Sequence, residues 1–89
     1  MIVMQAYVLL SCVSGYEKEI INELKAIPEV VEVNGIWGKY DIFVKISSLE
    51  LFGIEKTIEK IRSIKQITSS DTMHVIYGQG GSVDSLDKG

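Results

Sequence analysis

The sequence has very few of the residues that build cross-links and metal sites. Of its 89 residues, one is cysteine and one is histidine. A single cysteine, Cys12, excludes a disulfide within the chain, and His74 lies too far from it in sequence to give the ligand spacing of a zinc site. We therefore expect no metal or other cofactor. A chain this short buries a limited core, so we expect it to gain stability by association with other chains.

Positive charge is also scarce. Nine Lys and Arg residues stand against twelve Asp and Glu, which gives a net charge of −3. No basic cluster offsets this balance, so we expect no direct binding to nucleic acid. The apolar start, residues 1–10, has no basic leader and no small-residue cleavage site, and no apolar run is long enough for a membrane span. These absences predict a cytoplasmic chain without a membrane partner.

The one proline, Pro28, marks the end of the first predicted helix, because it disfavours helical geometry at the residue before it. Ser14 and Glu17 have the spacing of a capping box, which predicts that this helix starts at Ser14. An apolar stripe follows at helical spacing. Its members are Ile20, Ile21, Leu24 and Ile27. The segment before the helix, residues 7–13, is apolar in both alternation classes, which predicts a strand covered on both faces.

Glycines bracket the turn at residues 35–41 and allow residues 30–36 and 40–46 to fold back as a β-hairpin. In the second arm Ile42, Val44 and Ile46 form one face and Asp41, Phe43 and Lys45 the other, and we expect the first face to point to the core. An aspartate, Asp41, stands at the exit of this turn. A plain hairpin turn and a functional turn are both compatible with this spacing.

A second helix is predicted after the hairpin, with Ser47 as its cap and Ser48 as the alternative. Its expected core stripe is Leu51, Ile54, Ile58 and Ile61. The last predicted strand covers residues 67–77, and its first half is rich in hydroxyl groups. These hydroxyls fit either an exposed edge strand or a polar pocket. His74 in this strand reads as a structural rather than a catalytic histidine, and Cys12 as a small hydrophobe rather than a reactive thiol.

The order strand, helix, strand, strand, helix, strand matches the ferredoxin-like pattern, an α+β fold. We expect a four-stranded antiparallel sheet with both helices on one face, forming one domain over residues 1–77, followed by a flexible tail over residues 78–89. The sheet face opposite the helices would carry Phe43 and alternate residues of the first strand. This face is too apolar for water, which predicts a second copy packed sheet to sheet, as in a dimeric α+β barrel.

Several segments resemble the effector domain of the leucine-responsive/asparagine regulator (Lrp/AsnC) family, also called the RAM domain. The resemblance covers about residues 6–77, and its most specific feature is a glycine-x-aromatic-aspartate turn before an alternating strand. The residues that carry it are Ala6 to Leu10, Gly15, Leu24, Ile27 to Val30, Gly38 to Asp41, and Ser70 to Thr72. Full-length members also carry an N-terminal helix-turn-helix domain. This chain is similar to the stand-alone effector modules that lack it.

The resemblance implies a dimer formed through the sheets, assembly of dimers into an octamer-like ring, and a small effector, usually an amino acid, bound between dimers. It implies no cofactor, and an indirect effect on transcription through full-length regulators. By position, the implied ligand-binding residues are Gly38, Lys39, Tyr40, Asp41, Ser70 and Thr72. Asp41 would accept from the α-ammonium of the ligand, and amides and hydroxyls would bind its α-carboxylate.

Two other interpretations stay open. Dimeric α+β barrels also include small enzymes such as monooxygenases and isomerases, and His74, Asp41 and Tyr77 are the residues that could take part in such chemistry. A purely structural assembly module would have no ligand at all.

Overall fold

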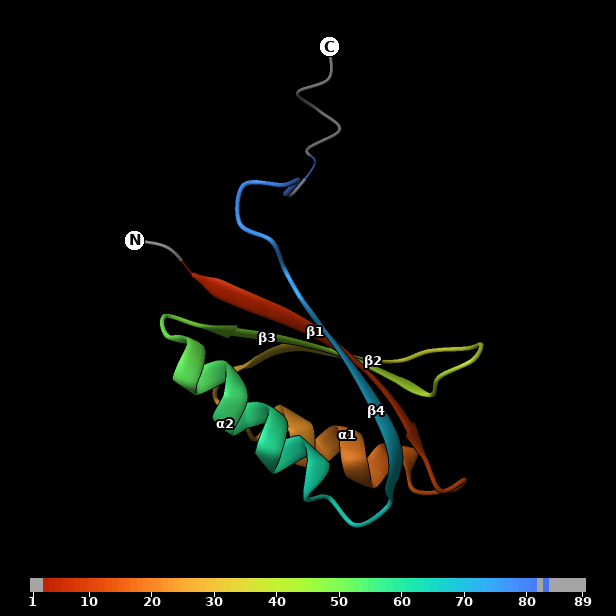
Figure 1. The fold of residues 1–89 in the computed structure, drawn as a ribbon. Helices are drawn as coiled ribbons and strands as arrows, with labels where there is room; N and C mark the ends of the chain where they lie inside the picture. Colours follow the sequence, from red (N-terminus) through yellow and green to blue (C-terminus); the bar gives the residue numbers. More distant parts are fainter. Residues whose placement is uncertain (1–2, 82, 84–89) are drawn as a thin grey trace.

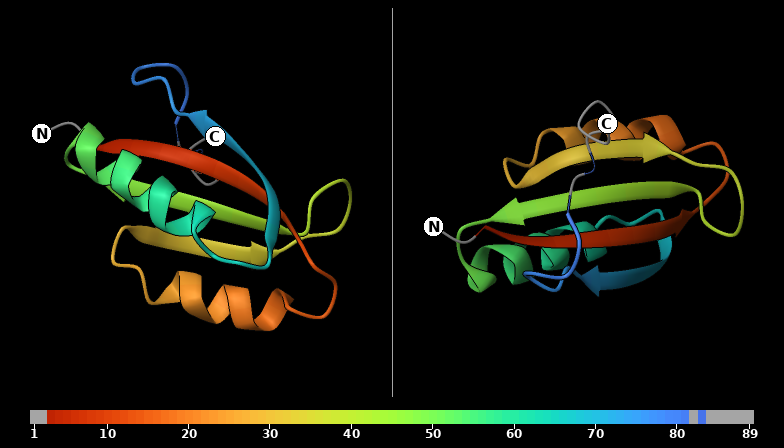
Figure 2. Two further views of the ribbon diagram at one scale, coloured as in Figure 1. Left: turned by 60° about the horizontal axis from the view of Figure 1, so that its bottom comes forward. Right: turned by 90° about the horizontal axis from the view of Figure 1, so that it is seen from above.

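The computed structural model describes residues 3–81 and 83 of the chain. Its elements, in order, are β1 (Met4–Cys12), α1 (Glu17–Lys25), β2 (Val30–Gly35), β3 (Ile42–Ser48), α2 (Leu51–Arg62) and β4 (Ile67–His74). The strands form one antiparallel sheet in the order β2-β3-β1-β4. Both helices lie against one face of this sheet (Figures 1 and 2). The predicted ferredoxin-like fold is confirmed.

The core lies between the sheet and the two helices. In the central strands every second side chain points toward the helices, as Val8 of β1 and Val44 of β3 do at directly paired positions. Burial of one such aliphatic side chain contributes about 1.5–3 kcal/mol. The buried residues include the predicted inward face of β3 and most of the predicted helix stripes. They are Ala6, Val8, Leu10, Ile20, Leu24, Ile42, Val44, Ile46, Ile54, Ile58 and Ile61.

The predicted capping box of the first helix does not form. Helix α1 begins at Glu17 with Tyr16 at its N-cap, and no side chain caps it. The Glu17 carboxylate does reach back to a backbone amide, but it accepts from the N–H of Gly15 at 2.8 Å rather than from Ser14. The helix ends at Lys25, with Ala26 as the C-cap, so its last residue lies before Ile27, the position at which Pro28 disfavours helical geometry.

The predicted cap of the second helix is wrong for a different reason. Ser47 and Ser48 belong to β3, where pairing with β1 holds them in extended geometry. Helix α2 therefore begins later, at Leu51, with Glu50 as its N-cap, and the Ser48 hydroxyl accepts from the Glu50 N–H at 3.3 Å. Leu51 was predicted to be buried but is 47% exposed, because it is the first residue of α2 and lines an open groove beside Met4.

The last strand is shorter than predicted. β4 ends at His74, and only one further backbone bond, from the N–H of Val75 to the carbonyl of Gln5, continues its pairing with β1. The chain then turns at Gly78 and Gly80, both with positive φ. Of the expected flexible tail, residues 82 and 84–89 lie outside the described part of the chain.

The sheet face opposite the helices, called the open face below, is formed at its centre by Tyr7, Leu9 and Phe43. These three side chains are half-buried, and the rings of Tyr7 and Phe43 lie 5.6 Å apart between centroids. Leu9 is paired with Phe43 on one side and with Asp71 on the other. The sequence left open which alternation class of β1 would face outward. The structure assigns Tyr7 and Leu9 to the open face.

Candidate functional site

The loop at residues 36–41 is held closed by its own backbone and by β1. The N–H of Ile36 donates to the carbonyl of Asp41 at 2.9 Å, and the N–H of Asp41 donates to the carbonyl of Leu10 at 2.8 Å. Gly38 has φ +143°, a value that favours glycine, and nothing lies near its α-carbon on the side where a side chain would be. The loop is therefore fixed at its base and exposed at its tip.

The Asp41 side chain already has a partner in the fold. Its Oδ2 atom accepts from the N–H of Cys12 at 2.9 Å, at the point where β3 no longer supplies a backbone acceptor to β1. This bond ties the loop to the end of β1. It uses one carboxylate oxygen and leaves the other for a ligand.

Two neighbours of Asp41 lie on the loop with it. The Tyr40 hydroxyl donates to Oδ2 of Asp71 at 3.3 Å, a contact that crosses β1 to reach β4. The Lys39 ammonium lies 5.9 Å from the centre of the Tyr40 ring. Asp71 was not predicted as a site residue. The sequence feature that could have indicated Asp71 is its place inside the hydroxyl-rich stretch of the last strand.

Ser70 and Thr72 project to the other side of the sheet. They are paired with Leu10 and Val8, whose side chains face the helices. The Ser70 hydroxyl accepts from Nε of Arg62 on α2 at 3.1 Å. The Thr72 hydroxyl is buried and has no hydrogen-bond partner. It is a polar group that the fold does not satisfy, which is rare among buried side chains.

The six predicted site residues thus form two groups within one protomer. Tyr40 meets Asp71 on the open face and Asp41 closes the end of β1, while Ser70 and Thr72 lie on the helix face of β4. Gly38 and Lys39 are exposed at the loop. Since β4 is at an edge of the sheet, the Ser70 hydroxyl lies where another chain can approach it, whereas the Thr72 hydroxyl is buried within its own protomer.

The end of β1 has two carboxylates beside it, Asp41 bonded to the N–H of Cys12 and Glu17 bonded to the N–H of Gly15. Burial raises the pKa of the Cys12 thiol, and the carboxylates of Asp41 and Glu17 raise it further. Cys12 packs against the core, as expected of a small hydrophobe. An ammonium group placed in this environment would be favoured by both carboxylates.

We expect Cys12 to react slowly with iodoacetamide in the folded protein near neutral pH. A raised pKa lowers the fraction of thiolate, which is the reactive form. Native protein should therefore be alkylated more slowly than protein unfolded in urea, as measured by mass spectrometry over time. Asp41→Asn should speed the native reaction, since it removes one charge that raises the pKa. Equal native and unfolded rates in the wild type would contradict this prediction.

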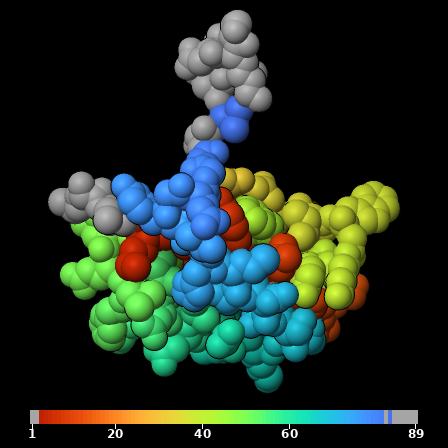
Figure 3. All heavy atoms as spheres, turned by 45° about the horizontal axis from the view of Figure 1, so that its top comes forward, coloured from red at the N-terminus to blue at the C-terminus, as the bar shows by residue number. Residues whose placement is uncertain are grey.

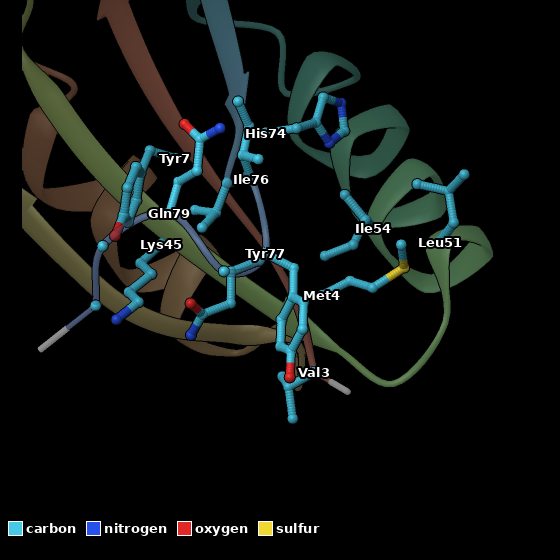
Figure 4. Close-up of a pocket in the computed structure, with 15 residues that line it drawn as sticks. Val3, Met4, Tyr7, Lys45, Leu51, Ile54, His74, Ile76, Tyr77 and Gln79 are labelled. Carbon is cyan, nitrogen blue, oxygen red and sulfur yellow. The ribbon is translucent and has the colours of Figure 1, made fainter. Parts of the chain in front are cut away.

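A separate groove of about 990 Å³ opens at the other end of β1 (Figure 4). Tyr7 and Lys45 line it from the sheet, Leu51 and Ile54 from α2, and residues 74–81 from the last strand and the turn that follows. His74 and Tyr77 belong to this groove, whereas Asp41 lies beside Cys12 at the far end of the strand. The three residues considered for catalysis therefore do not come together.

Within residues 3–81 and 83, no group of three or more His, Cys, Asp or Glu side chains could hold a metal ion. Over the same residues, no helix has the length and apolar character that crossing a membrane requires.

Comparison with known proteins gives matches over most of the chain. It is 34% identical over 73 residues to a homocitrate synthase from Sulfurisphaera tokodaii, which covers 81% of this chain and 16% of the enzyme. It is 32% identical over 73 residues to the transcriptional regulator FL11 from Pyrococcus horikoshii, covering 82% of this chain and 48% of the regulator. The chain thus spans about half the length of that regulator and a small part of that enzyme.

Solved structures agree with these matches. FFRP-DM1 is 35% identical and superposes with a TM-score of 0.78, covering 82% of this chain and 99% of the other. A Neisseria meningitidis transcriptional regulator, solved with L-methionine, has a TM-score of 0.73 at 13% identity, covering 89% of this chain and 53% of the regulator. That likeness shows the fold alone. The family model of the Lrp/AsnC ligand-binding domain matches residues 5–77. The chain belongs to the Lrp/AsnC ligand-binding domain family, a family of regulatory, effector-binding modules.

Proposed function

We propose that this chain binds a small amino acid and that Asp41 accepts from its α-ammonium group. The observation that carries the proposal is the anionic end of β1, where the Asp41 carboxylate is tied to Cys12 and raises the pKa of its thiol together with Glu17. Asp71 adds a further carboxylate, reached through the Tyr40 hydroxyl. A carboxylate-rich corner with one free oxygen on Asp41 suits a cationic ligand group. The match to the Lrp/AsnC ligand-binding domain model supports a small bound ligand.

The α-carboxylate of the ligand needs donors, and the remaining predicted residues can supply them. The exposed loop offers the backbone amides of Gly38 and Lys39, and β4 offers the hydroxyls of Ser70 and Thr72. Ser70 and Thr72 lie on the helix face of their own protomer, so we assign them to a site shared with the loop of a neighbouring protomer. The edge position of β4 and the exposed Ser70 hydroxyl support this assignment, and the buried Thr72 hydroxyl would have to become accessible on assembly.

At the level of the cell, we propose that the module acts in the cytoplasm as a homo-oligomer, with sheet-to-sheet dimers forming a larger ring. It would affect transcription indirectly, by assembling with full-length Lrp/AsnC regulators. The match to part of FL11 supports this role. Its acidic balance, 12 acidic against 9 basic residues, disfavours direct contact with nucleic acid.

The match to one segment of homocitrate synthase favours a second candidate function. In homocitrate synthase, the segment that matches this chain is part of an enzyme rather than of a transcription factor. In this alternative the chain would bind its amino acid while attached to, or assembled with, a metabolic enzyme, and would regulate that enzyme. It would itself remain a sensor without catalytic residues.

A ligand screen by thermal unfolding tests the proposal. An amino acid that binds only the folded state stabilises it, by ~2.7 kcal/mol when present at 100 times its dissociation constant. We expect one or a few of the twenty amino acids to raise the melting temperature, and their α-keto acids, which lack the ammonium group, to have no effect. Equal stabilisation by the keto acid would place the ammonium elsewhere. No stabilisation by any amino acid would leave the purely structural module as the better interpretation.

A further inference from the structure

The proposed amino-acid site offers a charged partner to only one of the two charges of its ligand. The Asp41 carboxylate accepts from the α-ammonium, whereas the α-carboxylate meets neutral donors, which are backbone amides and the hydroxyls of Ser70 and Thr72. A hydrogen bond from a charged donor to a carboxylate is roughly twice as strong as one between neutral groups. A cation beside Ser70 would therefore complete the site.

Arg62 is a cation in that position. It is the last residue of α2, and its Nε atom donates to Oγ of Ser70 at 3.1 Å. A guanidinium has several N–H donors in one plane, and this bond uses one of them. Within residues 3–81 and 83, the structure gives the Arg62 side chain no other hydrogen bond. The terminal nitrogens, Nη1 and Nη2, can therefore bind both oxygens of a carboxylate in the paired geometry that arginine favours.

Ser70 positions this guanidinium. The Arg62 side chain is exposed, so without a partner it would sample many rotamers, and the bond to Ser70 holds it against β4 before a ligand arrives. The Ser70 oxygen accepts in this bond, which leaves its own hydrogen to donate to the same carboxylate. Any cation in the last turn of a helix is favoured by the helix dipole. The bond to β4 is what distinguishes Arg62 from Lys60, which lies in the same turn.

Arg62 lies at the same end of the sheet as the loop that carries Asp41. The N–H of Asp41 donates to the carbonyl of Leu10, and Leu10 is paired with Ser70 on its other side. The end of α2, the start of β4 and the loop between β2 and β3 lie together at this end (Figure 2). Figure 3 shows the loop standing out from the body of the molecule. A protruding loop can reach beyond its own protomer to a helix face that presents Arg62 and Ser70.

We infer that Arg62 binds the α-carboxylate of the ligand and restricts the site to amino acids whose carboxylate is free. The inference rests on the proposed amino-acid site and adds a residue and a selectivity to it. The ligand would be held at both charges, its ammonium by Asp41 and its carboxylate by Arg62. An α-carboxamide keeps the ammonium but has no negative charge, so it would lose the second contact. The site would thus reject amidated and decarboxylated forms of its amino acid.

The probes that test this inference are the twenty amino acids and their α-carboxamides, compared by thermal shift and then by calorimetry. A pH of about 6 keeps the α-amine of both kinds of ligand protonated. Wild-type protein should bind its amino acid about tenfold to a hundredfold more tightly than the matching carboxamide. Arg62→Gln should lower amino-acid affinity by about the same factor, leave carboxamide affinity nearly unchanged and so remove the preference. A merely structural role would change both affinities equally.

Lys60→Gln is the matched control, because it removes the same charge from the same turn of α2 and should leave both affinities unchanged. Since Arg62 is exposed, Arg62→Gln should fold normally, which circular dichroism verifies. The inference is overturned if Arg62→Gln keeps the wild-type preference, or if Lys39→Gln removes it instead, which would place the carboxylate at the loop. In those cases the wild type still binds an amino acid. The absence of binding by every amino acid would instead overturn the proposed function, and the role of Arg62 with it.

Discussion

Replacing Leu9 with lysine should convert the proposed dimer into a monomer. Leu9 is half-buried at the middle of the open face, with Phe43 and Asp71 at its paired positions. In a sheet-to-sheet dimer the exposed part of Leu9 would become buried. A lysine at this position would then lie close to the same lysine of the second protomer. Juxtaposed like charges cost several kcal/mol, so we expect dissociation to be favoured by more than about 100-fold.

The substitution is chosen to spare the monomer. A lysine at position 9 lies directly across from Asp71, an opposite charge that supports the sheet. Leu49→Lys is the matched control, because Leu49 is 61% exposed in the connection between β3 and α2 and does not line the groove that Tyr7 shares with α2. Analytical ultracentrifugation of both variants at micromolar concentration is the measurement. A Leu9→Lys protein that stays dimeric would show that the sheets do not form the interface.

The second large effect concerns Asp41. Its bond to Cys12 in the fold and its proposed contact with the ligand can be tested separately. Asp41→Ala removes the acceptor of the Cys12 N–H, so it should lower the free energy of unfolding by about 1.5–3 kcal/mol even without ligand. Asp41→Asn keeps an oxygen for that N–H but removes the negative charge. We expect it to stay close to wild-type stability while losing about 1.5–3 kcal/mol of amino-acid affinity, roughly tenfold to a hundredfold.

Urea unfolding and calorimetry measure the two quantities independently. Thr72→Val is the comparison variant, because it removes a neutral hydroxyl that has no partner in the fold. It should leave stability unchanged or slightly raised and weaken binding less than Asp41→Asn does. If Asp41→Asn binds the amino acid as tightly as the wild type, the ammonium group lies elsewhere and Asp41 is purely structural.

The bond that Asp41 makes in the fold could be predicted only in part from the sequence. The glycine-x-aromatic-aspartate pattern predicted a turn with a carboxylate at its exit, and both are present. That the carboxylate meets the amide of Cys12, 29 residues away, depends on the pairing of β1 with β3. A contact of this kind has no local signature.

The helix starts show the same limit. Two pairs have the spacing of a capping box, Ser14 with Glu17 and Ser47 with Glu50. Neither serine caps a helix in the structure. Ser47 instead belongs to β3, because it pairs with Gln5 of β1. Long-range pairing outweighed a local preference worth about 1 kcal/mol.

The sequence by itself determined the order of the elements, the helix stripes and the inward face of β3, because these depend on periodic burial that is written residue by residue. It also indicated the family, through the turn that ends at Asp41. Only the tertiary structure decided which side of the sheet each site residue occupies, since a shift of one residue in register moves a side chain to the opposite face. It thereby placed Asp71 beside Tyr40 and turned Ser70 and Thr72 toward the helices.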